Sequence, residues 1–101
     1  MFYLYILHSA ASDVFYIGIT DNPARRLKEH NESEHVTYTS KHRPWTLKAV
    51  FRVGENRGDA MKLERFIKKN RSRRMMESLC SRDFVPDGRL AQLVRVMDVH
   101  D

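Results

Sequence analysis

Two short segments near the N-terminus constrain the fold of this chain more than any other feature. "FYLYILH" at residues 2–8 and "VFYIGIT" at residues 14–20 are rich in the aromatic and β-branched residues typical of strands. Only "SAASD" separates them, so we expect an antiparallel hairpin. Period-two alternation places Leu4 and Ile6 on one face of the first strand and Tyr5 on the other.

The segment after the hairpin carries the signals of a helix over residues 21–31. Asn22 suits the N-cap, and Pro23 suits the first helical position, where its missing N–H costs nothing. The periodicity predicts that Ala24 and Leu27 form the buried side of this helix.

The second half of the chain predicts one more strand and several helices. "WTLKAVFRV" at residues 45–53 alternates, which predicts a third strand whose inward side chains are Leu47, Ala49, Phe51 and Val53. A helix is expected from near Asp59 to about Asn70, with an apolar stripe of Ala60, Leu63 and Ile67. A short helix is expected in "RSRRMMESLC" and a final one in "RLAQLVRVM". The pattern predicts the α+β class, with a three-stranded antiparallel β-sheet flanked by helices in the order β-β-α-β-α-α.

Length and cysteine content limit the class of protein. A chain of 101 residues is expected to form one domain, in which residues 81–101 are a C-terminal extension of residues 1–80. No apolar run approaches the roughly 20 residues of a membrane helix, and the N-terminal segment lacks the basic flank of a signal peptide. A single cysteine, Cys80, excludes an intramolecular disulfide and fits a reducing compartment, so we expect a cytoplasmic protein with no membrane contact.

The net charge of +5 is concentrated in one part of the sequence. Between Ala60 and Met76, seven basic residues accompany a single acidic one, Glu64, whereas the rest of the chain is close to neutral. Such a cluster attracts polyanions, of which nucleic acid is the natural candidate. A solvated helix face has the same pattern, so charge alone does not decide between the two.

Several polar residues occupy positions that a purely structural role does not require. Tyr5 and Tyr16 lie near the middles of two strands that should pair, although a buried tyrosine often only fills space. Gly18 indicates either a close backbone approach or the exit kink of its strand. Arg26 and His30 are four residues apart and share a helix face, where an arginine suits a phosphate but is also an ordinary exposed residue.

Glu64 is the most informative of these residues. It falls inside or beside the apolar stripe of its helix, where a carboxylate is costly without a partner. That partner is either a divalent cation such as Mg²⁺, which takes one or two protein carboxylates, or a nearby cation such as Arg65 or Lys68. Taken together, the phenols, the guanidinium, the imidazole and this carboxylate are the groups that phosphodiester hydrolysis needs.

These residues resemble the GIY-YIG nuclease superfamily, and in particular its small single-domain bacterial branch. "YIG" stands at residues 16–18, "LYI" at residues 4–6 replaces Gly-Ile-Tyr, and "AMKLE" ends at Glu64. "RPW" and "IKK" are similar to that branch, which itself resembles the nuclease domain of structure-specific endonucleases. The resemblance covers about residues 2–78 and implies a GIY-YIG-like nuclease domain over residues 1–80.

The resemblance implies an endonuclease that hydrolyses phosphodiester bonds in DNA, with branched or damaged DNA as candidate substrates, as in DNA repair. Glu64 would hold one Mg²⁺ or Mn²⁺, and Tyr5, alone or with Tyr16, would orient and deprotonate water. Arg26 would stabilise the phosphate charge, and His30 would assist proton transfer. Some members of the superfamily carry a second histidine after the first helix, for which the candidates are His35, Tyr38 and His42.

Nucleic acid is the expected partner, and DNA is favoured over RNA. The candidate contacts are basic residues from the first helix, the loop and the basic cluster, namely Arg25, Lys41, Arg43, Lys62, Arg65, Lys68, Lys69, Arg71, Arg73 and Arg74. We expect no separate targeting domain in a chain of this length, so a protein partner is a further expectation. Two alternatives stay open, a non-catalytic nucleic-acid-binding module and a nuclease subunit that needs a targeting partner. The enzyme hypothesis requires that Tyr5, Tyr16, Arg26 and Glu64 converge.

Overall fold

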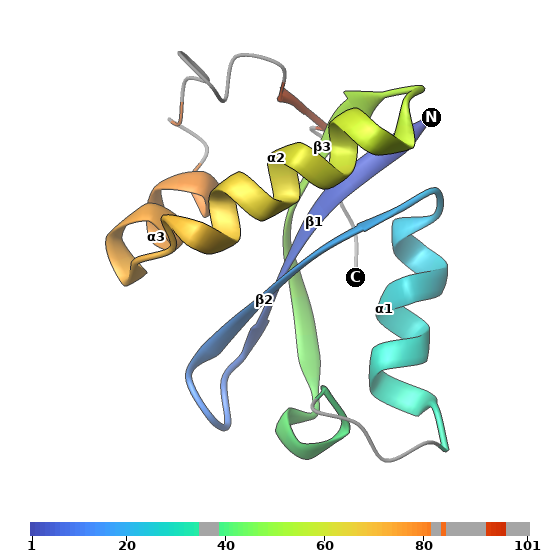
Figure 1. Cartoon of the computed structure of the whole chain (residues 1–101). Helices are drawn as coiled ribbons and strands as arrows, with labels where there is room; N and C mark the ends of the chain where they lie inside the picture. The colour runs from blue at the N-terminus through green and yellow to red at the C-terminus, as the bar shows by residue number, and fades with distance from the viewer. Residues whose placement is uncertain (35–38, 82–83, 85–92, 97–101) are drawn as a thin grey trace.

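A computed structural model gives the arrangement of the chain, and it describes residues 1–34, 39–81, 84 and 93–96. The elements are β1 (Phe2–Ser9), β2 (Val14–Thr20), α1 (Pro23–Glu32), the 3-10 helix η1 (Thr39–His42), β3 (Trp45–Gly54), α2 (Arg57–Lys69), α3 (Arg73–Cys80) and β4 (Val94–Arg95). The three long strands form an antiparallel sheet with helices packed on it (Figure 1), so the predicted α+β class and element order are confirmed.

The predicted hairpin is present and forms one edge of the sheet, whose strand order is β2-β1-β3-β4. Tyr3–Ser9 of β1 pair with Val14–Thr20 of β2, and the pairing places Tyr5 directly opposite Gly18. The turn between them is closed by a 2.7 Å hydrogen bond from the backbone N–H of Asp13 to the carbonyl of Ser9. Asp13 adopts a φ of 53°, a left-handed conformation that Asp tolerates better than most residues.

Two apolar clusters lie on the two faces of the sheet. The larger one contains Leu4, Ile6 and Ile17 together with side chains of α2 and α3. The smaller one contains Tyr5 and Leu7, with Tyr16 and the α1 side chain Leu27 packed against it. The alternation predicted for β1 is therefore confirmed, and α1 lies on the opposite face of the sheet from α2 and α3.

A bulge in β3 makes one part of the predicted pattern wrong. Ala49 and Phe51 join the larger cluster as expected, but Leu47 belongs to the smaller one. The register explains the difference, because Ile6 pairs with Ala49 while the next residue, Leu7, pairs with Leu47. One extra residue in β3 turns the strand's side chains to the other face.

The first helix begins as predicted but buries different residues. Asn22 is its N-cap, and the Asn22 side chain accepts a hydrogen bond from the backbone N–H of Arg25 at 3.1 Å. Ala24 is exposed, so its predicted burial is wrong, and Leu27 is only half-buried. The buried residue of α1 is His30, which is 5% exposed.

The last predicted helix is also wrong where the structure describes it. Val94–Arg95 form β4, which pairs with Phe51 and Arg52 of β3, and residues 89–92 and 97 lie outside the described residues. Leu93 is buried in the larger cluster. The division of the chain at residue 80 stays a prediction. Among the described residues, no helix has both the length and the apolar character that crossing a membrane requires.

Candidate active site

The packing of Tyr5 on Gly18 explains the glycine in the second strand. A Cβ atom added to Gly18 would lie 2.6 Å from Cζ of the Tyr5 ring, closer than real side chains approach. Gly18 therefore marks a close approach between the backbone of β2 and an aromatic ring. Its alternative role as a simple exit kink does not account for this contact.

Tyr5, Tyr16 and His30 form a compact group of rings drawn from β1, β2 and α1. The Tyr5 hydroxyl makes a hydrogen bond of 2.9 Å with Nε2 of His30. The Tyr16 ring meets His30 edge-on at 4.8 Å between centroids, and the two tyrosine rings are 6.3 Å apart. Tyr5 is 1% exposed, whereas Tyr16 is half-buried, so Tyr16 is the phenol of this group that solvent reaches.

Burial sets the protonation of this group. Burial, reinforced by the positive charge of Arg26, lowers the pKa of His30 to about 4, so the imidazole is neutral at pH 7. Burial and the neighbouring Tyr16 raise the pKa of Tyr5 to about 12. Arg26 acts in the opposite direction on the Tyr5 pKa through a hydrogen bond and its charge, but burial outweighs it. Tyr5 therefore stays protonated at neutral pH in the protein alone.

Arg26 lies on the same face of α1 as His30, as predicted, and reaches the phenol of Tyr5. Its guanidinium also donates a hydrogen bond of 3.1 Å to the Glu29 carboxylate. The side chain is 35% exposed, so one side of the guanidinium faces the tyrosines and another faces solvent. An arginine in this position can meet a phosphate at the edge of the ring group.

Glu64 approaches the same group from α2. Its side chain is 23% exposed, and its negative charge contributes to raising the Tyr5 pKa. Nζ of Lys68 lies 3.3 Å from the Glu64 carboxylate, so the salt bridge that sequence reasoning offered as an alternative is formed. This ion pair is partly exposed and therefore contributes little stability. The Glu64 carboxylate can thus give up Lys68 for another cation at little cost.

The donor set around Glu64 suits only a loosely held ion. Within the described ranges, no three or more His, Cys, Asp or Glu side chains gather in a way that would hold a metal. Mg²⁺ is commonly bound by one or two carboxylates while it keeps several waters and binds substrate phosphate oxygens. A single half-buried carboxylate whose charge acts on the Tyr5 phenol fits that kind of site.

Two residues outside the ring group attach the end of α1 to the start of β3. The Asn31 side chain accepts a 2.6 Å hydrogen bond from the backbone N–H of Trp45 and donates one of 3.0 Å to the Trp45 carbonyl. Arg43 donates to the backbone carbonyl of His30 and, at 2.7 Å, to that of Ser33. Sequence reasoning missed Asn31, and it assigned Arg43 to nucleic acid although its guanidinium is engaged here.

Of the three candidates for a second histidine, only one can be placed. His35 and Tyr38 lie outside the described residues. His42 bonds through Nδ1 to the Ser12 hydroxyl at 2.8 Å and stands 6.2 Å from the Trp45 ring. It therefore connects η1 to the hairpin turn.

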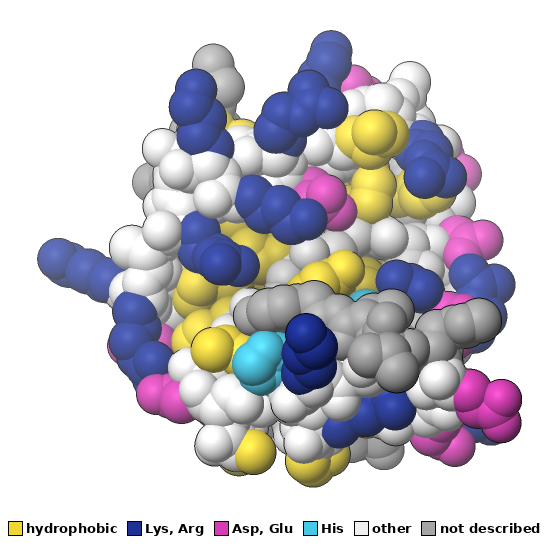
Figure 2. Space-filling view, turned by 60° about the horizontal axis from the view of Figure 1, so that its bottom comes forward, with side chains coloured by type: hydrophobic (Ala, Val, Ile, Leu, Met, Phe, Trp, Pro, Cys, Tyr) yellow, Lys and Arg dark blue, Asp and Glu magenta, His cyan; other side chains and the backbone are white. Residues whose placement is uncertain are grey.

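The predicted basic cluster is divided among different surfaces. Arg73 forms ion pairs with Asp13 at 2.9 Å and with Glu77 at 3.0 Å, so it joins α3 to the hairpin. Arg71 and Arg74 are exposed, as is Lys41 of η1, which lies outside the cluster. The remaining members lie on α2, where a groove of about 500 Å³ is lined by Lys62, Arg65, Phe66, Lys69 and Asn70. Figure 2 shows Lys and Arg side chains spaced around an area where hydrophobic side chains reach the surface.

Comparison with known proteins agrees with this arrangement. The family model described as GIY-YIG catalytic domain matches residues 1–77, which include β1, β2, α1 and α2, the elements that carry the ring group, Arg26 and Glu64. Among curated proteins, none matches the chain. Members of the family are generally endonucleases that act on nucleic acid and use a divalent metal ion. The match covers more than half of the sequence, and the chain belongs to the GIY-YIG family.

Proposed function

We propose that this protein is a metal-dependent endonuclease that hydrolyses phosphodiester bonds in DNA. The observation that supports the proposal is the convergence of five side chains from four elements, which are Tyr5, Tyr16, Arg26, His30 and Glu64. The family match supports a nuclease in general. The choice of DNA, the single Mg²⁺ or Mn²⁺ and the roles below are our proposals.

In this proposal Tyr5 orients the attacking water without losing its own proton. A phenol with a pKa of about 12 is a weak acid at neutral pH, and its oxygen can accept a hydrogen bond while it bonds to His30. Because Tyr5 is 1% exposed, the water would enter the ring group with the substrate, from the side of the half-buried Tyr16. The neutral imidazole of His30 fixes the direction of the Tyr5 hydroxyl. Tyr16, the more exposed phenol, lies on the solvent side of the pair and contacts the same water or the phosphate.

Arg26 and Glu64 act on the phosphate from two different helices, α1 and α2. Arg26 donates hydrogen bonds to oxygens on which negative charge builds in the transition state. Glu64 would exchange Lys68 for the divalent ion, since one carboxylate cannot serve both fully. When bound, the ion neutralises phosphate charge and lowers the pKa of water. Lys68 would then turn toward the phosphates of the substrate.

The finer parts of the proposal concern substrate, partners and location. Exposed cations on α1, α2 and α3 support contact with a polyanion longer than one phosphate. Branched or damaged DNA, a targeting protein and a cytoplasmic location stay predictions.

A second function is favoured by two observations. The Glu64–Lys68 ion pair and the high pKa of Tyr5 are also what a non-catalytic nucleic-acid-binding module would show. Such a module would bind nucleic acid in a salt-dependent way but would cleave none. The two functions therefore differ in cleavage and not in binding.

Cleavage of a panel of plasmid, single-stranded, flap and junction DNA, with matching RNA, in Mg²⁺ or Mn²⁺ tests the proposal. We expect the wild type to cut at least one DNA substrate, and Glu64→Gln to lose at least about 100-fold in rate, since it removes the ion's carboxylate. Glu32→Gln is the matched control, because Glu32 is an exposed glutamate of α1 away from the rings. Binding without cleavage of any substrate would favour the non-catalytic module.

A further inference from the structure

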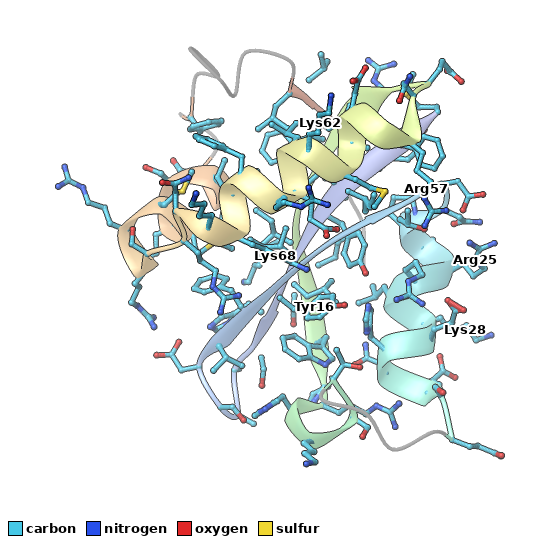
Figure 3. The ribbon with its side chains drawn as sticks, viewed as in Figure 1. Tyr16, Arg25, Lys28, Arg57, Lys62 and Lys68 are labelled. Atoms are coloured by element: carbon cyan, nitrogen blue, oxygen red, sulfur yellow. The ribbon has the colours of Figure 1, made fainter. Side chains whose placement is uncertain are left out.

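Helix α2 carries cations on two different sides. One side, the Glu64 flank, consists of Arg57, Glu64 and Lys68, because spacings of seven and eleven residues return within about 20° of the starting direction at 100° per residue. Lys62 lies about 140° around the axis from Arg57 and lines the groove on the other side, the Lys62 flank. Figure 3 shows Lys62 and Lys68 on opposite sides of α2.

Arg57 shares a pocket with Arg25 at the end of the Glu64 flank. The pocket has a volume of about 350 Å³ and is lined by Phe2, Ile19, Thr20, Asp21, Arg25 and Arg57. The two arginines therefore reach the same space from α2 and α1, as Figure 3 also shows. Arg25 donates to Asp21 at 2.8 Å, whereas Arg57 has no ion pair within the described part of the chain.

The position of this pocket relative to the proposed active site follows from helix geometry. Arg57 precedes Glu64 by seven residues, which is about 10 Å along the axis at 1.5 Å per residue. Lys68 lies one turn beyond Glu64 in the opposite direction, about 6 Å further along. The same flank thus offers a cation before the carboxylate and another after it.

We propose that the Arg25–Arg57 pocket binds a backbone phosphate of the nucleic-acid strand that is cut, a few nucleotides from the scissile bond. The strand then runs along the Glu64 flank, from the pocket past Glu64 to Lys68. Planar guanidinium groups suit this role because each can donate two hydrogen bonds to one phosphate. This inference rests on the proposed function. It adds Arg57 to the nucleic-acid contacts, although the sequence alone did not point to that residue.

Asp21 makes the inference more specific. Its carboxylate occupies one guanidinium edge of Arg25, so it competes with a phosphate for the same donors. Removing that charge should therefore tighten binding, although it removes an ion pair from the protein. Because loss of any acidic side chain raises the net charge, the gain must exceed that of Glu32→Gln, an exposed carboxylate outside the pocket, to be specific to Arg25.

The test measures binding of fluorescently labelled single-stranded and duplex DNA by anisotropy, in EDTA so that no cleavage occurs, over a series of salt concentrations. Arg57→Ala should weaken binding several-fold and reduce the slope of log affinity against log salt by roughly 0.7 to 0.9. Lys62→Ala removes one exposed lysine from the other side of the same helix and should change both quantities less. Asp21→Asn should tighten binding.

Equal losses from Arg57→Ala and Lys62→Ala would overturn the inference, because binding would then follow net charge alone. Unchanged or weaker binding by Asp21→Asn would also contradict it. Thermal melting of each variant separates these outcomes from unfolding. Failure of the proposed function is distinguishable, since it appears as absence of metal-dependent cleavage by the wild type, whatever the binding results.

Discussion

The contact between Tyr5 and Gly18 makes Gly18→Ala the most informative substitution in this protein. The added Cβ would lie 2.6 Å from Cζ of Tyr5 and 2.8 Å from Cε1, so the ring must move. Tyr5 is fully packed, and overfilling a core costs about 1–3 kcal/mol. Movement of the ring also breaks its hydrogen bond to the buried Nε2 of His30, which costs about a further 1–3 kcal/mol.

The lower flexibility of alanine acts in the opposite direction, so the sign of the stability change tests whether the clash is present. Without the clash, alanine in a strand is more stable than glycine by roughly 0.5–1 kcal/mol. We therefore expect Gly18→Ala to destabilise the wild type by about 1–5 kcal/mol. In a Tyr5→Val background the hydroxyl oxygen and the two ring carbons that approach Gly18 are gone, so the same substitution should be neutral or stabilising by about 0.5 kcal/mol.

Urea unfolding followed by fluorescence provides the assay, because Trp45 is the single tryptophan and is 3% exposed. The four proteins form a double-mutant cycle whose coupling energy should be at least about 1 kcal/mol. Tyr5→Phe alone serves as a control for the lost hydroxyl. A loss below about 0.5 kcal/mol for Gly18→Ala, or equal losses in both backgrounds, would refute the reasoning.

Four further predictions follow from the site and the hairpin. NMR titration should place the pKa of His30 near 4. Because this pKa is lowered from about 6.5, the stability that neutral His30 contributes is lost as the pH falls from about 6.5 to 4. A measured pKa near 6.5 would contradict the burial of His30. Asn31→Ala should lower the free energy of unfolding in urea by about 2–4 kcal/mol, because it leaves the backbone N–H and C=O of Trp45 unpaired. A loss as small as that of the exposed control Asn70→Ala would show that Asn31 does not hold α1 to β3. The hydrogen bond from Arg73, together with one from His8, lowers the pKa of Asp13 to about 2. The ionised Asp13 carboxylate therefore contributes stability above pH 4, and this contribution is lost as the pH falls toward 2. In Asp13→Asn the melting temperature should depend less on pH over that range. Tyr16→Phe should leave the urea midpoint nearly unchanged while it slows cleavage, and equal rates would remove Tyr16 from the proposed mechanism.

Much of the fold could be predicted because its signals are local. The hairpin follows from two alternating segments and a short link, and Asn22 with Pro23 marks the start of α1. The bulge in β3 could not be predicted, since it arises from how two strands pair and not from either sequence alone. A single inserted residue there moved Leu47 to the other face.

The residues of the site could be predicted better than their environments. The motif positions led to Tyr5, Arg26 and His30, and these do meet. Their protonation depends on burial by three elements, which no local pattern encodes, so the opposite effects of Arg26 and burial on Tyr5 appeared only in the structure. Asn31 was missed because its partner lies fourteen residues away across a predicted loop.

The most direct measurement of the central claim is where a divalent ion binds. Mn²⁺ added to isotopically labelled protein broadens NMR signals near the ion, without any need for substrate or activity. We predict broadening of the Glu64, Tyr16 and Arg26 signals at low Mn²⁺ concentrations, and its loss in Glu64→Gln but not in the control Glu32→Gln. Broadening elsewhere on the surface, or broadening at these residues that survives Glu64→Gln, would contradict Glu64 as the residue that holds the ion.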